Sequence, residues 1–399
     1  MNDDQNGLKA LEERSLLPTY AKFPFALARG SGAYVWDEAG RRYLDFYGGH
    51  AVCLLGHCPP RVVEAVCEQA KRLLFYSNLV YHGGRARAAE ALVKLCAVPG
   101  GQVFFCNSGA EANEAAMRVA RRATGRPRII ATLGSFHGRT AGALAATGLA
   151  SYKKDVPGLG RDVSHIPFGD LAAAEAALTQ DAAGIILEPI QSMAGIVVPP
   201  PDYLPGLAEL CRRNGSLLIF DEVQTGLGRL GAPTASQAFG VEADILTFAK
   251  ALGSGVPCAA ILAGPRTAAT VKPGDLGSTF GGGPLACAAI LATLEVLGEL
   301  RLWENAARLE AAIRRSLRFP RLREIRGRGL LLGLVLDGPS QPTRDALLRR
   351  AVLVGGAHDP NVIRLLPPLV IGDTEVALLR EALAKIWAAA PAAAANAPS

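Results

Sequence analysis

The stretch QVFFCNSGAEANEAAMRVARRA, residues 102–123, joins a short apolar run to a longer helical pattern. The run QVFFC predicts a strand, and the amphipathic stretch from Ala110 onward predicts a helix. The same alternation continues along the chain, with further apolar runs at 128–133, 184–189, 216–222, 244–250 and 258–264. Because these runs are continuously apolar, the sequence predicts an α/β fold with a mostly parallel sheet that is covered on both faces.

The two ends of the chain have other patterns. AYVWDEAGRRYLDF, residues 33–46, alternates and turns at Asp37–Gly40, which predicts a hairpin in an N-terminal segment of short strands. Past residue 285 the pattern is mainly helical, with strand-like runs at 330–337 and 361–368. The helices expected outside the central alternation lie at 61–75, 84–96, 284–319 and 343–351, and a last one ends near Trp387. The low-complexity tail 388–399 is expected to be frayed.

Composition excludes several classes of protein. The chain has 42 Lys and Arg against 36 Asp and Glu but no dense basic run, so nucleic acid is not an expected partner. The polar, acidic N-terminus is unlike a secretory signal, and no stretch approaches 18 apolar residues, so no membrane span is expected. Eight cysteines without a CxxC pair indicate buried free thiols in a cytoplasmic protein, and six histidines without ligand spacing indicate no metal site.

The segment Asn107–Glu111 is a candidate phosphate site. Ser108 and Glu111 have the spacing of a capping box, and Gly109 and Ala110 are small enough to leave the first amides of the helix open. Open amides and the helix dipole together favour an anion such as phosphate. The alternative is an ordinary capped helix.

Two charged residues follow other apolar runs directly. Asp221 ends SLLIFD, where it is either a fixed negative charge for a cationic ring nitrogen or a cap or loop ion pair. Lys250 ends DILTFAK between apolar neighbours, where it is either a nucleophilic amine with a lowered pKa or a lysine whose head reaches solvent. An anion site, an acid and a desolvated lysine at strand ends are together what pyridoxal 5′-phosphate requires.

A competing motif lies at Gly226–Gly231, where GLGRLG matches the glycine spacing of a dinucleotide-binding turn. Such a turn should join a strand directly to a helix. Here four residues separate the motif from the preceding strand, and Pro233 follows it. We therefore expect a structured loop rather than a site for a nicotinamide cofactor.

From about Leu17 to Trp387 the chain resembles the class III pyridoxal-phosphate aminotransferases, and within them the acetylornithine aminotransferase group. The motifs that carry the resemblance are YLDFYGGHAVCLLGHC, FFCNSGAEANEAAMRVAR, SFHGRT, LEPIQ, IFDEVQTGLGRLG, FAKALGSGVP, GSTFGGGPLACAA and VIRLLPPL. The resemblance implies a fold-type I transferase with a large cofactor domain, residues 51–285. The small domain would consist of an N-terminal segment, 1–50, and a C-terminal part, 286–399.

The resemblance also implies roles for single residues. Lys250 would bond to the cofactor aldehyde and Asp221 would pair with its ring nitrogen, and these two are the expected catalytic residues. The other expected cofactor ligands are Ser108, Gly109, Ala110, Phe136, Glu188, Gln224 and Thr279. Thr279 would serve the cofactor of a neighbouring subunit, which implies a homodimer. The expected substrate ligands are Arg139, Ser278 and Arg364.

Three segments depart from the family pattern, and in one of them, residues 56–60, GHCPP replaces GHCHP, a change that we expect to be neutral. Ser192 and Met193 replace a Gly-Glu pair whose glutamate neutralises the carboxylate-binding arginine, so we expect Arg364 to stay permanently available. Leu276 and Gly283 replace a histidine and an asparagine of the family. His50, in GGHAV, either points into the site or is structural.

The implied reaction transfers the ω-amino group of N-acetylornithine, or of a close N-acyl analogue, to 2-oxoglutarate. The products are a semialdehyde and glutamate, and the reaction serves arginine or lysine biosynthesis. The absence of the usual glutamate at Met193 keeps a second class III reaction open, with 4-aminobutyrate or a simple amine as the donor and pyruvate as one acceptor.

Overall fold

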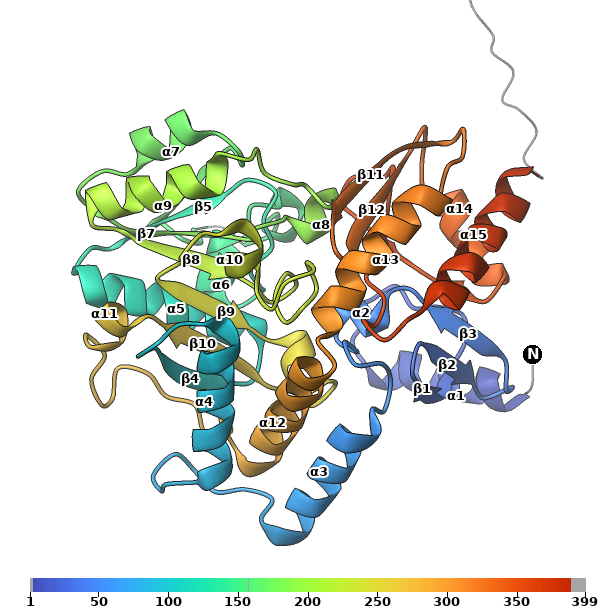
Figure 1. Cartoon of the computed structure of the whole chain (residues 1–399), viewed down its shortest axis with the longest axis horizontal. Helices are drawn as coiled ribbons and strands as arrows, with labels where there is room; N and C mark the ends of the chain where they lie inside the picture. The colour runs from blue at the N-terminus through green and yellow to red at the C-terminus, as the bar shows by residue number, and fades with distance from the viewer. Residues whose placement is uncertain (1–2, 157, 389–399) are drawn as a thin grey trace, which may run out of the picture.

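The computed structural model describes residues 3–156 and 158–388 (Figure 1). Beyond Ala388, the tail that was predicted to be frayed lies outside the described residues. Within the described parts of the chain, every helix is too short or too polar to cross a bilayer.

A seven-stranded sheet forms the centre of the larger part of the molecule, on the left of Figure 1. Its strand order is β4-β10-β9-β8-β7-β5-β6. The strands are β4 (Gln102–Cys106), β5 (Arg128–Thr132), β6 (Val163–Ile166), β7 (Ala182–Leu187), β8 (Leu217–Asp221), β9 (Ile245–Phe248) and β10 (Ala259–Ala263). Only β10 among them runs antiparallel to its neighbours, so the prediction of a mostly parallel α/β sheet is confirmed.

Consecutive residues of the central strands belong to two separate hydrophobic clusters. Ile185 and Leu218 belong to one cluster, together with residues of helices α4 (Gly83–Cys96) and α9 (Tyr203–Asn214). Their neighbours Ile186 and Ile219 pack on the other face with α5 (Gly109–Thr124). This alternation is the pleat of the sheet, and both faces are buried, as the continuously apolar runs predict.

Both chain ends build the smaller part of the molecule. The predicted hairpin is present as β2 (Tyr34–Asp37) and β3 (Arg42–Asp45), with β1 (Leu27–Ser31) on one side. On the other side β3 pairs in parallel with β13 (Val352–Leu353), which comes from the opposite end of the chain. A third sheet has the order β11-β12-β15-β14, formed by Leu322–Arg328, Leu331–Leu336, Val362–Leu365 and Gly355–Gly356.

Long helices connect and cover these sheets. Helix α12 (Pro284–Glu299) starts with proline at its first turn and packs against α4 and α3 (Pro60–Arg72) (Figure 1). The predicted helical region after residue 285 continues as a second helix, α13 (Leu302–Ser316). The remaining helices are α2 (Gly48–Ala51), α6 (Ala141–Ala146), η1 (Ala150–Tyr152), α7 (Leu171–Ala177), α8 (Ser192–Gly195), α10 (Ala235–Phe239), η2 (Lys250–Gly253), α11 (Pro265–Ala268), α14 (Gln341–Arg349) and α15 (Asp373–Ala388).

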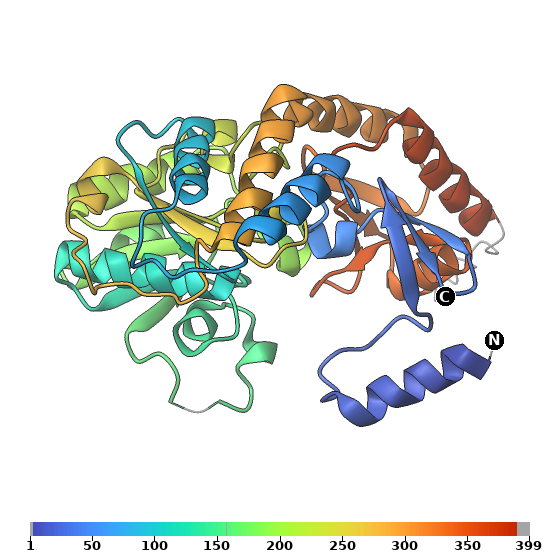
Figure 2. The same cartoon turned by 90° about the horizontal axis from the view of Figure 1, so that it is seen from below.

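Two features differ from the expectations. The N-terminal segment holds a helix, α1 (Asp3–Ser15), that the sequence did not predict, and Figure 2 shows it set apart from the sheets. Leu8 and Leu11 of this helix are exposed, so it lacks the buried apolar stripe that would have identified it. The eight cysteines are free, but Cys58 and Cys67 are exposed, so the prediction of uniformly buried thiols was wrong.

Candidate active site

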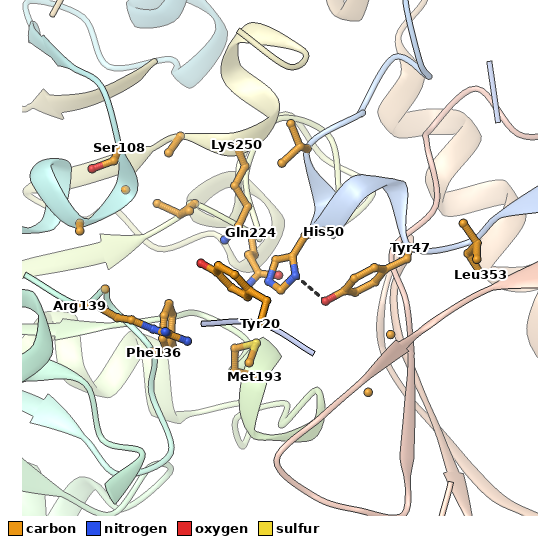
Figure 3. A pocket seen from close by; sticks show the side chains of 18 of the residues that line it. Tyr20, Tyr47, His50, Ser108, Phe136, Arg139, Met193, Gln224, Lys250 and Leu353 are labelled. Carbon is orange, nitrogen blue, oxygen red and sulfur yellow. Dashed lines mark hydrogen bonds between the residues drawn. The ribbon is translucent and has the colours of Figure 1, made fainter. Parts of the chain in front are cut away.

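A cavity of about 1250 Å³ opens at the carboxyl ends of the parallel strands. Its lining combines residues that follow β4, β5, β7, β8 and β9 with residues from both chain ends. Parallel α/β sheets present their ligand sites at this edge. In Figure 3 the side chain of Lys250 reaches into the cavity, with Tyr47 and His50 on one side and Phe136 and Arg139 on the other.

The first turn of α5 forms one wall of this cavity. Ser108 is the N-cap, and its Oγ accepts a hydrogen bond of 3.3 Å from the backbone N–H of Glu111. The Glu111 carboxylate accepts in return from the backbone N–H of Asn107 at 3.1 Å. The predicted capping box is therefore present, except that Glu111 accepts from the N–H of Asn107 instead of that of the N-cap residue Ser108. Gly109 and Ala110 line the cavity beside this capped end.

Asp221 ends β8, is 3% exposed and is fixed by three donors. Its Oδ2 lies 2.7 Å from Nδ2 of Asn113 and 2.8 Å from Nδ1 of His137, and its Oδ1 accepts from the backbone N–H of Val223 at 3.0 Å. The carboxylate therefore pairs with a loop histidine, as the alternative for Asp221 stated, and it also lines the cavity. Sequence reasoning missed Asn113 and His137, which come from other elements.

Lys250 follows β9 after one residue and has a left-handed backbone, with φ of 44°. That conformation is costly for a residue with a side chain and is typical of functional sites. Burial, with a smaller effect from the charge of Arg364, lowers the pKa of Lys250 to about 8 against the opposing effects of Asp221 and Glu188. The predicted lowering of the lysine pKa is therefore present.

Glu188 organises the region after β7. Burial, and then the charge of Asp221, raises its pKa to about 7. Its carboxylate accepts hydrogen bonds from the backbone N–H groups of Phe136 at 2.9 Å and Ser192 at 3.1 Å. Phe136 lines the cavity, with its ring centroid 5.2 Å from that of Tyr152. Glu188 thus fixes two chain segments that form the cavity wall.

Arg364 lies in β15 and is only 1% exposed. Its Nε donates to the carbonyl of Gly356 at 2.5 Å, its Nη1 to Ser192 Oγ at 3.1 Å and its Nη2 to Tyr47 Oη at 3.2 Å. Both hydroxyl partners are neutral, and no carboxylate among the described residues forms an ion pair with this guanidinium, so its permanent availability stays a prediction. Met193, at the departing position, lines the cavity without contributing a charge (Figure 3).

Three other residues line the cavity, namely Gln224, Arg139 and His50. Gln224 is 7% exposed, and its Oε1 accepts from Ser192 Oγ at 3.0 Å. Arg139 is exposed at the cavity, with its guanidinium 4.7 Å from the ring centroid of Tyr152. His50 lines the cavity, as one of the two alternatives for it stated, and burial followed by the charges of Lys250 and Arg364 lowers its pKa to about 3.

Three of the predicted site residues lie outside the cavity lining: Arg364, which reaches the lining through its bond to Tyr47, and also Ser278 and Thr279. Ser278 is held by Nδ2 of Asn107 at 3.1 Å and accepts from the backbone N–H of Gly281 at 3.1 Å. Thr279 is exposed, as is its neighbour Phe280. Across the described residues, neither Ser278 nor Thr279 lines the cavity.

The GLGRLG segment is a loop between β8 and α10, as predicted. Gly228 and Gly231 have φ of 87° and 82°, and the loop is anchored by the buried Arg229. Arg229 Nη1 donates to the carbonyls of Leu330 and Pro367. These bonds attach the loop to the C-terminal region, so the glycine motif serves packing rather than dinucleotide binding.

Comparison with known proteins identifies the family. A model of the family described as aminotransferase class-III matches residues 17–387. An acetylornithine aminotransferase from Methanothermobacter thermautotrophicus is 44% identical over 378 residues, which cover 94% of this chain and 96% of that protein. The chain belongs to the class III aminotransferases.

Solved structures of aminotransferases share the whole fold. The ornithine aminotransferase from Toxoplasma gondii superimposes with a TM-score of 0.91 at 33% identity, over 96% of this chain and 95% of that chain. Another structure of that enzyme contains pyridoxal phosphate at its active site. An ω-transaminase from Thermomicrobium roseum has a TM-score of 0.88 at 31% identity, over 96% of this chain and 98% of that chain. Class III aminotransferases depend on pyridoxal 5′-phosphate, and this chain is such an enzyme.

The chemistry of the cavity fits this cofactor. A capped helix N-terminus with small residues suits its phosphate, a buried carboxylate suits its ring nitrogen and a lysine of lowered pKa suits its aldehyde. Gly109 leaves no room for a larger side chain, since a Cβ there would lie 3.2 Å from the methyl groups of Val223. The three groups that the sequence predicted at separate strand ends therefore meet in one cavity.

Proposed function

We propose that this aminotransferase transfers the ω-amino group of N-acetylornithine, or of a close N-acyl analogue, to 2-oxoglutarate. The products are the corresponding semialdehyde and glutamate, and the reaction belongs to arginine or lysine biosynthesis in the cytoplasm. The observation that carries the proposal is the arrangement of arginines around Lys250. Arg139 lines the cavity (Figure 3). Arg364 donates to the hydroxyl of Tyr47, which lines the same cavity.

The cofactor would be held by residues that the cavity brings together. Ser108, Gly109 and Ala110 would bind the phosphate, and Asp221 would face the ring nitrogen. Phe136 would pack on the ring, Gln224 would lie at the phenolic oxygen, and Glu188 would fix both segments through its two backbone bonds.

When bound, pyridoxal phosphate supplies an aldehyde for the amine and a ring that withdraws electrons from the neighbouring carbon. Asp221, fixed by three donors, would hold its carboxylate against that ring nitrogen. The Nζ of Lys250, whose pKa burial lowers to about 8, would accept and return the substrate proton. Such acid–base steps contribute roughly 10²–10⁴-fold to rate.

The substrate carboxylates would be bound by arginine. Arg364 can form two parallel bonds to a carboxylate, and Arg139 is exposed at the cavity where the other end of an extended donor would lie. Ser278 would contribute through the loop that Asn107 holds. These contacts suit a donor and an acceptor that both carry carboxylates, which favours N-acetylornithine with 2-oxoglutarate over simple amines.

We further propose a homodimer in which Thr279 serves the cofactor of the partner subunit. Its exposure, outside the cavity of its own chain, supports this assignment. The division into a large domain, 51–285, and a small domain from 1–50 and 286–399 is supported by β13 pairing with β3.

A donor and acceptor panel tests the reaction. Purified holoenzyme is given N-acetylornithine, N-succinylornithine, N-succinyl-diaminopimelate, 4-aminobutyrate or a simple ω-amine, each with 2-oxoglutarate or pyruvate. Glutamate formed from an N-acyl donor, with little product from 4-aminobutyrate or amines, is the expected result. Alanine formed from a simple amine as the main product would instead assign the second class III reaction. Lys250→Ala should abolish product formation with every donor.

A further inference from the structure

The guanidinium of Arg364 is held by two hydroxyl groups, and each hydroxyl has an acceptor of its own. On the first side, Arg364 Nη1 donates to Ser192 Oγ at 3.1 Å, and Ser192 Oγ donates to Gln224 Oε1 at 3.0 Å. Ser192 is fully buried. The serine O–H therefore donates its hydrogen bond to Gln224, and the lone pairs of the serine oxygen remain to accept from the guanidinium.

The second side repeats this order with other residues. Arg364 Nη2 donates to Tyr47 Oη at 3.2 Å, and Tyr47 Oη lies 2.5 Å from Nδ1 of His50 (Figure 3). Arg364 can only donate hydrogen bonds, so the hydroxyl of Tyr47 accepts from Arg364 and is left to donate to the imidazole of His50. His50 can accept it, because burial first, and then the charges of Lys250 and Arg364, lower the pKa of His50 to about 3.

Both chains of hydrogen bonds consist of neutral groups. Ser192 and Tyr47 stand in contact with the guanidinium, while Met193 is apolar. A neutral acceptor orients an arginine without cancelling its charge, whereas a carboxylate would compete with the substrate. We infer that Ser192 and Tyr47 are the residues that position Arg364 for substrate carboxylates. Their neutral hydroxyl groups take over the contact with Arg364 that the family's glutamate makes. This inference rests on the proposed role of Arg364 as the carboxylate ligand.

Two consequences follow for binding. An incoming carboxylate forms charge-assisted bonds with the N–H groups of Arg364 that the carbonyl and the two hydroxyls leave free, and no ion pair has to break. Loss of either hydroxyl leaves one N–H of the buried guanidinium without its acceptor. The plane of the Arg364 guanidinium is then less well fixed for binding a carboxylate. Both hydroxyls therefore favour dicarboxylate binding.

Binding of glutarate, a dicarboxylate that cannot react, tests the inference on the holoenzyme. Its dissociation constant is measured by calorimetry, and cofactor absorbance is recorded to confirm that each variant is loaded. Ser192→Ala and Tyr47→Phe should each weaken glutarate binding about tenfold, as expected for a hydrogen bond to a charged group. Tyr43→Phe, which removes another buried tyrosine hydroxyl outside the cavity, should bind glutarate like the wild type.

A second test introduces a negative charge at position 192 instead of removing the hydroxyl. Ser192→Asp places a carboxylate against Arg364 and should weaken glutarate binding about a hundredfold or more, beyond the effect of Ser192→Ala. The KM for 2-oxoglutarate should follow the same order in all these variants. Equal glutarate binding by Ser192→Asp and Ser192→Ala would show that the charge of the Arg364 partner does not matter, and the inference would then be wrong.

Arg364→Ala separates the inference from the proposal under it. If this variant binds glutarate like the wild type, the carboxylate role of Arg364 fails and the inference fails with it. If Arg364→Ala loses glutarate while Ser192→Ala and Tyr47→Phe retain wild-type binding, the role of Arg364 stands and the positioning by the two hydroxyls is wrong.

Discussion

Nδ1 of His137 lies 2.8 Å from Oδ2 of Asp221, and both side chains are buried beneath the cavity. Asn113 bonds to the same carboxylate oxygen, so the acid cannot rotate away from the cavity. The histidine thus acts through Asp221 rather than on the substrate.

This relationship predicts different losses for the two residues. Asp221→Ala removes the charge itself and should lower kcat by about a hundredfold or more, comparable to the loss of one preorganised electrostatic group. His137→Phe keeps the charge and removes one of its three donors, so a smaller loss, on the order of tenfold, is expected. Steady-state kinetics on loaded enzyme measures both values. A larger loss for His137→Phe would contradict the positioning role.

The lowered pKa of Lys250 predicts how cofactor uptake depends on pH. Burial and the charge of Arg364 bring this pKa to about 8, so the neutral, reactive amine predominates above that pH. The rate of covalent pyridoxal phosphate uptake by the apoenzyme should rise from pH 7 to pH 9 and then level off. An ordinary lysine, with a pKa of about 10.4, would give a rate that still rises at pH 10. Stopped-flow absorbance measures this profile, with Lys250→Arg as the control without uptake.

His57 predicts a pH-dependent stability. Burial lowers its pKa, but hydrogen bonds to Asp45 and Cys53 outweigh this and raise it to about 10. Since the folded value exceeds the unfolded value near 6.5, its contribution is complete below pH 6.5 and disappears as the pH rises to 10. The melting temperature of His57→Asn should lie a few degrees below that of the wild type at pH 6, and the difference should shrink toward pH 10. A constant difference would exclude this titration as the cause.

Arg229 predicts that the GLGRLG loop contributes to stability. Its guanidinium is buried and donates to carbonyls of Leu330 and Pro367, which would lose their donor in Arg229→Met. The expected cost is about 1–3 kcal/mol of unfolding free energy, measured by urea denaturation. Arg318→Met, at a surface arginine, is the matched control and should change stability by less than about 0.5 kcal/mol.

Shared sites predict complementation between two inactive variants. Lys250→Ala and Thr279→Asp should each be inactive alone, the second because a carboxylate repels phosphate. A mixture refolded or coexpressed as heterodimers should regain activity, since one of its sites combines an intact Lys250 with an intact Thr279. Random pairing would restore about a quarter of the sites in a symmetric dimer. No recovery, despite heterodimers seen by tagged pull-down, would place Thr279 outside the neighbouring site.

The strand ends could be predicted because they depend on local pattern. Asp221 and Lys250 each follow a buried apolar run, and parallel strands bring such ends to one edge. The partners of these residues could not be found in this way. Asn113 is one of many polar positions on α5, and only the register of that helix on the sheet brings it to Asp221. Arg364 and Tyr47 meet across 317 residues of sequence, a contact that no local pattern contains.

The order in which the ribosome makes these residues has a consequence for biosynthesis. Tyr47 and His50 are made first, the residues around Lys250 in the middle, and β15 with Arg364 near the end. At typical translation speeds, on the order of ten seconds separate Lys250 from Arg364. During that time the residues of this chain from Ser108 to Lys250 that would bind the cofactor have been made, whereas Arg364 has not. Any cofactor captured on the ribosome would therefore meet the amine nucleophile before the enzyme can select its substrates.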